Sequence, residues 1–271
     1  MDATKKYLMI GVPPLVAMLA LAASCSGEAG SASGAGAMVS SAPAGGAVAS
    51  ADSGSLADRS SRQGFPLSDD FGDGLCIGAC AGAVWALTQE IEGQVAVDQG
   101  TLRARAGPRG SVVPKAALIA RPGRMADGDT LDISFRMRVP EGVPLNSIHL
   151  LDIECAECGV PGNPGIRLYL RDGRLRIDRS KIGVEHAWTN GSAPQLANGR
   201  WHHVRVRVHL ASDDAGGAQV WLDDAPVLEG RGRTLLAGTG RFADRIQFGI
   251  TATSNTVGVA AQFDDFLADL R

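Results

Sequence analysis

The chain has 271 residues, of which 26 are Lys or Arg and 29 are Asp or Glu, so its formal net charge is −3. It therefore has no basic excess that would attract nucleic acid or an anionic lipid surface. The roughly 200 residues from 64 to 271 are enough for one domain with a sizeable core and few for two.

Residues 1–24 have the features of a signal peptide. Lys5 and Lys6 precede the uncharged stretch 8–23, which is shorter than the roughly 20 apolar residues of a membrane-spanning helix. The segment LAASC that follows resembles the lipobox of bacterial lipoproteins, and the resemblance implies that Cys25 carries a lipid anchor. We therefore expect attachment to a lipid bilayer, at the outer membrane or cell surface. A secreted or periplasmic protein is the alternative.

Residues 25–63 consist almost entirely of Ser, Ala and Gly. Such a segment buries too little apolar surface to offset the entropy lost when its backbone is ordered. We predict a disordered linker that holds residues 64–271 away from the membrane.

The remaining chain is predicted to be all-β. Segment 130–139 alternates apolar and polar residues with a period of two, and so does 201–210, which is typical of strands with one buried face. Asp172-Gly173 and Asp223-Asp224 mark two hairpins. Further strands are expected near 84–87, 94–97, 102–106, 116–121, 148–153, 245–251 and 259–270. Many short strands without a helical stripe predict an antiparallel β-sandwich.

Three motifs in this region resemble the concanavalin A-like lectin/glucanase superfamily, which has a laminin-G-like jelly roll. They are SDDFGDG (68–74), GRWHHVRVRVHL (199–210) with GGAQVWLDDAPV (216–227), and AQFDDFLADL (261–270). The resemblance implies that Trp201 packs in the core. It also implies that the first and last strands are neighbours, which would bring Asp70 close to Asp265. These two carboxylates could bind structural calcium. We favour the alternative, in which they cap turns.

Apart from Cys25, the cysteines form two close pairs, Cys76/Cys80 and Cys155/Cys158. Zinc could take both pairs, but in an exported protein we favour disulfides. Pairing within each cluster and pairing between the clusters both remain open.

Two sets of residues are candidates for the cleavage of a polysaccharide. In LLDIE (150–154), Asp152 and Glu154 match the carboxylates of a glucanase strand, but Leu150 replaces the nucleophile, which argues against glycoside hydrolysis. A lyase needs a base and a cation beside a uronate carboxylate, and His149, Arg167 and Tyr169 could supply them. The R-x-E-x-R and Tyr-x-Lys motifs of alginate lyases are absent, however, because FRMRV (135–139) has no Glu at its centre.

The run RLYLRDGRLRIDRSK (167–181) is basic, and its alternation favours a solvated strand face over an anion-binding surface. Trp188, with Asn190 beside it, is the candidate for stacking on a sugar. A tryptophan that folds back on the domain is equally compatible with the sequence.

These observations favour a lipid-anchored protein whose jelly roll binds a glycan or another surface component, without catalysis. One alternative is a polysaccharide lyase that acts on an acidic polysaccharide. The other is a non-catalytic module that recognises protein.

Overall fold

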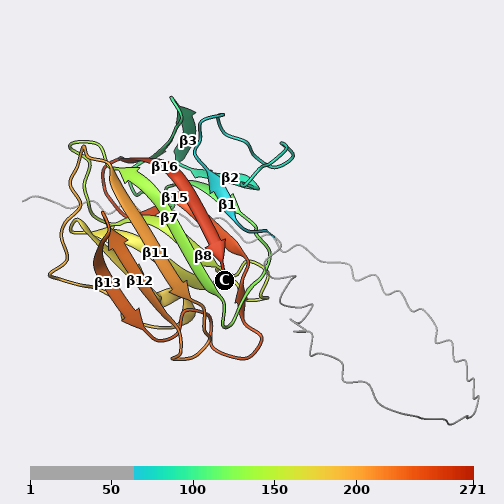
Figure 1. Ribbon diagram of the computed structural model, residues 1–271. Coiled ribbons are helices and arrows are strands. Elements are labelled where there is room, and N and C mark those ends of the chain that lie inside the picture. Colours follow the sequence, from blue (N-terminus) through green and yellow to red (C-terminus); the bar gives the residue numbers. More distant parts are fainter. Residues whose placement is uncertain (1–63) are drawn as a thin grey trace, which may run out of the picture. The chain divides into compact units, whose positions relative to one another are not determined.

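A computed structural model of the chain describes residues 64–271 (Figure 1). The predicted signal peptide, the predicted lipidation site Cys25 and the predicted linker lie outside these residues. The one helix of the described region is a three-residue 3₁₀ turn, η1 (Ser180–Ile182), so no helical segment there could span a bilayer.

The fold is an antiparallel β-sandwich, as predicted. One sheet has eight strands in the order β13-β12-β11-β7-β16-β4-β3, with β1 paired to β16, and the other has six in the order β10-β9-β8-β15-β5-β2. The strands of the first sheet are β1 (Leu67–Asp69), β3 (Gly93–Asp98), β4 (Thr101–Ala106), β7 (Thr130–Arg138), β11 (His202–His209), β12 (Gly217–Leu222), β13 (Ala225–Arg231) and β16 (Val259–Leu270). Those of the second are β2 (Leu87–Ile91), β5 (Lys115–Ala120), β8 (Ile148–Glu154), β9 (Gly165–Arg171), β10 (Arg174–Asp178) and β15 (Arg245–Thr253), while β6 (Met125–Ala126) and β14 (Phe242–Ala243) form a small separate pair.

Every second side chain of the strands points into the space between the two sheets and fills it. In β7 every second residue, from Leu131 to Met137, is buried, and the residues between them are partly exposed. Both predicted hairpins form: Asp172 and Gly173 have φ of 53° and 72°, and Asp223 and Asp224 have φ of 50° and 65°. The second hairpin thus places two aspartates in the left-handed region, which Asp tolerates better than most side chains.

An aromatic cluster joins the sheets at the centre of the core. The Phe248 ring lies 5.9 Å from that of Trp85, 5.0 Å from Phe135, 4.9 Å from Phe263 and 4.7 Å from Phe266, measured between centroids. Each of these five side chains is at most 1% exposed. Phe248 belongs to the six-stranded sheet, whereas Phe135, Phe263 and Phe266 belong to the other, so this contact holds the layers together.

Trp201, which the family resemblance placed in the core, lies on the outer surface instead. His202, the next residue, is buried, and successive strand side chains point to opposite faces. The guanidinium groups of Arg136 and Arg138 lie 5.1 and 5.4 Å from the Trp201 ring. The partly buried ring therefore lies against two cations on this face.

Replacing Phe248 tests the role of the aromatic cluster. Phe248→Ala should lower the free energy of unfolding by about 3–5 kcal/mol, because it leaves a cavity between the sheets. Val257→Ala is the control, since Val257 is 52% exposed and should change stability by less than about 0.5 kcal/mol. Urea unfolding measures both, and equal effects would contradict this description of the core.

Candidate active site

The outer face of the six-stranded sheet carries most of the buried polar side chains that the sequence singled out. In β8, Ile148, Leu151 and Ile153 enter the core, whereas His149, Asp152 and Glu154 lie on the opposite face. The pairing of β8 with β9 shifts between His149 and Leu151. The extra residue, Leu150, forms a bulge, which bends the strand and keeps both His149 and Asp152 on the outer face.

His149, Tyr169 and Arg167 lie together, as the lyase alternative required. His149 pairs with Tyr169 across β8 and β9, and their rings stack with centroids 5.2 Å apart and planes at 17°. Arg167 is two residues before Tyr169 on the same face and forms an ion pair with Asp178 of β10. Burial, followed by the positive charge of Arg167, lowers the pKa of His149 to about 4. The imidazole is therefore neutral at neutral pH.

Glu154 gathers three further groups of this face. Its side chain is completely buried. It forms an ion pair with Lys181 of η1, accepts a 2.5 Å hydrogen bond from Gln247 Nε2, and lies 3.7 Å from Arg245 Nε. Gln247 and Arg245 come from β15, so the cluster joins segments that are far apart in the sequence.

Asp152 and Lys115 complete the charged set. Asp152 Oδ1 accepts a 2.7 Å hydrogen bond from Thr251, and burial together with the charge of Glu154 raises the pKa of Asp152 to about 6. Burial lowers the pKa of Lys115, although Asp152 and Glu154 oppose the shift. Lys115 Nζ donates to Gln89 at 3.4 Å and forms no ion pair with a carboxylate of the described region.

Several buried polar atoms on this face have no hydrogen-bond partner. Seven such side-chain atoms occur within residues 64–271, and four belong to this face: His149 Nδ1, Arg167 Nε, Arg245 Nε and Gln247 Oε1. In native proteins nearly all buried polar groups are paired with protein, water or ligand. Water or a polar ligand would supply the missing partners of these four atoms.

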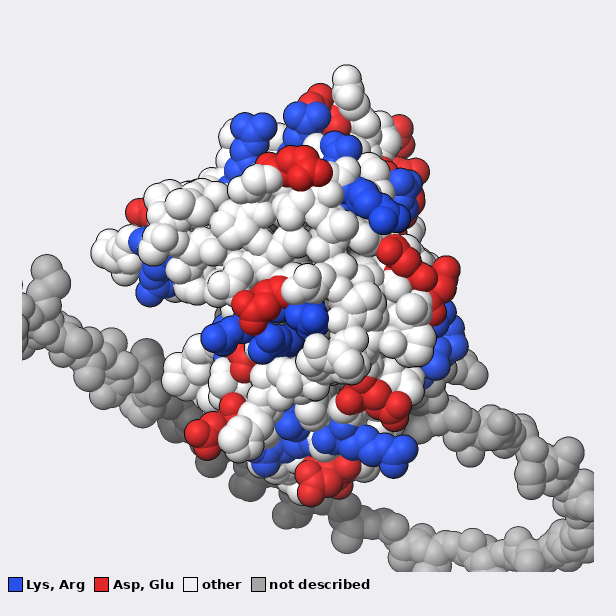
Figure 2. Space-filling view, turned by 90° about the vertical axis from the view of Figure 1, so that its left-hand side faces the viewer, with Lys and Arg blue, Asp and Glu red and all other residues white. Residues whose placement is uncertain are grey.

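The same face is hollowed. The eight-stranded sheet faces the viewer in Figure 1, so the six-stranded sheet lies on the left in the turned view of Figure 2. On that side the outline is indented between an upper and a lower lobe, and basic and acidic side chains gather at the indentation (Figure 2).

The sequence did not indicate that Lys115, Arg245 and Gln247 join this site. Each lies in an apolar strand, and the only signal was its position on the polar side of the alternation. The expectation of a solvated face for the basic run 167–181 was also wrong for its two ends. The side chains of Arg167 and Lys181 are only 20% and 27% exposed; Arg167 pairs with Asp178, and Lys181 pairs with the buried Glu154.

Trp188 and Asn190, the predicted sugar contacts, lie away from this face. The Trp188 ring packs under the Arg179 guanidinium, 4.0 Å from it, and rests on Gly230, where a Cβ would come within 2.2 Å of the indole. Asn190 Nδ2 donates to the Val227 carbonyl. Trp188 thus folds back on the domain, and sugar binding by this pair stays a prediction.

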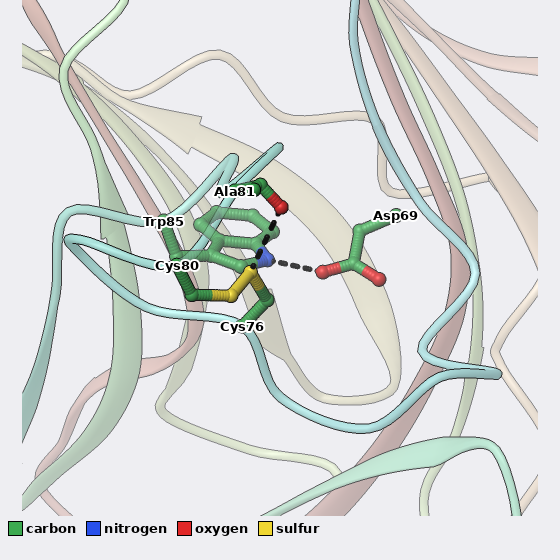
Figure 3. The surroundings of a disulfide bond; sticks show 5 residues. All are labelled: Asp69, Cys76, Cys80, Ala81 and Trp85. Carbon is green, nitrogen blue, oxygen red and sulfur yellow. Dashed lines mark hydrogen bonds between the residues drawn. A yellow bond between two sulfur atoms is a disulfide. The ribbon is translucent and has the colours of Figure 1, made fainter.

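The cysteine pairs differ. Cys76 and Cys80 form a disulfide, beside which Trp85 Nε1 donates to Asp69 at 2.7 Å (Figure 3). Cys155 and Cys158 are free thiols, and burial, followed by hydrogen bonding with Cys158, raises the pKa of Cys155 to about 12. Pairing between the clusters is therefore wrong, and so is the second local disulfide. Residues 64–271 hold no group of three or more His, Cys, Asp or Glu side chains that could bind a metal such as zinc.

The first and last strands, β1 and β16, are paired, as expected from the family resemblance. Asp70 and Asp265 line the same pocket. Asp70 accepts the Gly72 N–H at 2.9 Å, and Asp265 forms a 3.4 Å ion pair with Arg136. Both carboxylates thus have partners within the protein. The bond from Gly72 N–H to Asp70 is the turn capping that we favoured over calcium. Calcium at this place stays a prediction.

Comparisons with known proteins identify the family. A model of the polysaccharide lyase family matches residues 94–261, which is more than half of the chain. Among solved structures, the endo-β-1,4-glucuronan lyase of the fungus Trichoderma reesei is similar with a TM-score of 0.57 and 15% identity, over 76% of this chain and 95% of that chain. The cellulose-induced protein Cip1 gives 0.55 and 14%, over 76% and 96%, and alginate lyase Aly36B gives 0.54 and 14%, over 75% and 96%.

No curated protein matches the chain. The solved structures are too distant in sequence to show more than a shared β-sandwich fold, whereas the family model covers most of both sheets. The chain belongs to the polysaccharide lyase family.

Proposed function

We propose that the chain cleaves an acidic polysaccharide by β-elimination at a uronate sugar, on the outer face of the six-stranded sheet. One observation carries the proposal: His149 and Tyr169 stack beside Arg167 on a face where four buried polar atoms lack partners. The glucuronan lyase and the alginate lyase among the similar structures are named for polymers of uronates, which supports the same substrate class.

The preference for a non-catalytic glycan-binding or adhesion module was wrong. It depended on the absence of the sequence motifs of alginate lyases, and the match to the polysaccharide lyase family overturns it. The absent motifs are short segments of one strand, whereas the groups on this face come from several strands.

β-Elimination needs three groups. A base removes the proton next to the uronate carboxylate, a cation stabilises the negative charge that develops on that carboxylate, and an acid protonates the departing glycosidic oxygen. The carbon–oxygen bond to the departing sugar breaks, and a double bond forms in the uronate that remains.

His149 is the candidate base, because its imidazole is neutral and Nδ1 has no partner. A bound carboxylate would raise the pKa of His149 and so strengthen it as a base. Tyr169, stacked on His149, carries the hydroxyl that can protonate the departing oxygen. Lys115 and Arg167 are the cations for the carboxylate, and Lys115 has no carboxylate partner to displace.

The activity prediction concerns His149 and Tyr169. Incubation with polyglucuronate, polymannuronate or hyaluronan should give a product that absorbs in the ultraviolet because of its new double bond. His149→Ala and Tyr169→Phe should each lower kcat by roughly 10²–10⁴-fold, the usual contribution of a general acid or base. Arg105→Gln, an exposed change on β4 of the other sheet, is the control and should retain full activity. If His149→Ala formed the unsaturated product as fast as the wild type, this assignment would be wrong.

The protonation state of His149 can be tested without a substrate. An unfolded histidine takes up a proton near pH 6.5, whereas folded His149 does so only near pH 4, so protons favour the unfolded chain in between. The free energy of unfolding should therefore fall as the pH drops from 6.5 to 4, by at most about 3 kcal/mol from this residue. Urea unfolding of the wild type and of His149→Phe at pH 7, 5.5 and 4.5 measures the difference. Parallel pH profiles would show that His149 is not held neutral.

A further inference from the structure

We propose that Arg179 and Arg233 form a binding site for a tetrahedral oxoanion, phosphate or sulfate, at the edge of the sandwich. This site is separate from the catalytic face and does not depend on the proposed lyase activity. Two poorly hydrated guanidinium groups without a carboxylate partner carry the proposal.

The two arginines come from the edge strands of different sheets. Arg179 directly follows β10, and Arg233 comes two residues after β13. These two strands are in contact with each other. Both arginines line a surface hollow of about 540 Å³, which is within the usual size range of small-molecule sites. A ligand in this hollow would touch segments of both sheets.

Backbone carbonyls hold each guanidinium in place. Arg179 Nη2 donates to the His186 carbonyl at 3.2 Å, and Nη1 donates to the Arg233 carbonyl at 3.4 Å. Arg233 Nη2 donates to the Ile182 carbonyl at 3.0 Å. The Nε atoms of both arginines are among the buried atoms of the described region that have no hydrogen-bond partner. Because a guanidinium has five N–H donors, both groups keep donors for a ligand.

The two positive charges lack a counter-ion. Arg179 is only 9% exposed, and within residues 64–271 neither arginine forms an ion pair with a carboxylate. Burial, followed by the positive charge of Arg233, lowers the pKa of Arg179, and Asp214 opposes this shift only in part. Like charges that are held together away from water repel strongly. An anion bound to both arginines would remove this repulsion.

Gly232 leaves one side of the Arg179 guanidinium uncovered. It lines the same hollow, and its φ is 116°. A Cβ at this position would lie 3.2 Å from Arg179 Nη1. Any other residue would therefore crowd the guanidinium on the side of the hollow.

The arrangement of the two arginines favours a tetrahedral anion. A guanidinium binds two oxygens of an anion through two parallel N–H donors. A carboxylate has only two oxygens, so it satisfies one guanidinium in this way. Phosphate and sulfate have four oxygens in different directions, and can bind two guanidinium groups that approach from separate segments.

The site is separate from the proposed catalytic groups. The charges that act on Arg179 are those of Arg233 and Asp214, and neither residue lies on the outer face of the six-stranded sheet. Neither arginine is among the charges that shift the pKa of His149. The residues that line the hollow include none of the groups assigned to β-elimination.

The competing explanation is that Arg179 only covers Trp188, whose ring centre lies 4.0 Å from the guanidinium carbon. Such a role needs neither Arg233 nor an anion. It predicts that phosphate leaves both guanidinium groups unchanged.

The experiment titrates the full chain with inorganic phosphate, sulfate or acetate, while chloride keeps the ionic strength constant. Nitrogen-15 NMR follows the Nε–Hε signals of the arginines, and calorimetry gives Kd. The variants are Arg233→Gln and Arg179→Gln. The control is Arg105→Gln, which removes an exposed positive charge from β4.

Phosphate and sulfate should shift the Arg179 and Arg233 signals with saturation, and leave the Arg105 signal in place. Arg233→Gln should weaken Kd for phosphate by about tenfold or more, the usual effect of losing a hydrogen bond to a charged group. Arg105→Gln should bind phosphate as the wild type does. Phosphate should also raise the midpoint of thermal unfolding of the wild type, because it binds only the folded chain.

Two results would overturn the proposal: Arg179 and Arg233 signals that phosphate does not move, or equal Kd values for Arg233→Gln and Arg105→Gln. Acetate that binds as tightly as phosphate would reject the choice of a tetrahedral anion. If Arg179→Gln fails to fold because Trp188 loses its cover, Arg233→Gln and the wild-type titration still decide.

Discussion

The two-residue alternation of β8 is the constraint on which the rest of this structure depends. Its aliphatic residues fill the space between the sheets, and the same pleat turns His149, Asp152 and Glu154 to the outer face. Each of these three lies opposite a residue of a neighbouring strand. His149 is opposite Tyr169 of β9, and Asp152 and Glu154 are opposite Gln247 and Arg245 of β15. A shift of one residue in register would exchange core and site.

The site is held by electrostatics in a place that water reaches poorly. Burying two carboxyl groups two positions apart is unfavourable, and the structure compensates in two ways. Glu154 is paired with cations, whereas Asp152 becomes a weaker acid, with a pKa of about 6. The contribution of Asp152 to stability is therefore complete below its unfolded pKa of 3.8 and is lost as the pH rises through about 6. His149 has the opposite dependence, because its pKa is lowered.

Much of the fold could be predicted from the sequence, because alternation is a local signal: both hairpins and most strands lie within a few residues of where the pattern placed them. His149, Arg167 and Tyr169 were found because they share two neighbouring strands. Lys115 and Arg245 were not, since β5 and β15 join β8 through pairings over long sequence separations. For the same reason, searching single strands for lyase motifs gave the wrong preference about catalysis.

A crystal structure of the His149→Ala variant with a bound tetrasaccharide of consecutive uronates tests the central claim most directly. The account predicts sugar density in the recess on the outer face of the six-stranded sheet. A carboxylate of the sugar should lie near Lys115 and Arg167. Ordered sugar beside Trp188 or in the pocket of Asp70 and Asp265, with the recess filled only by water, would contradict it.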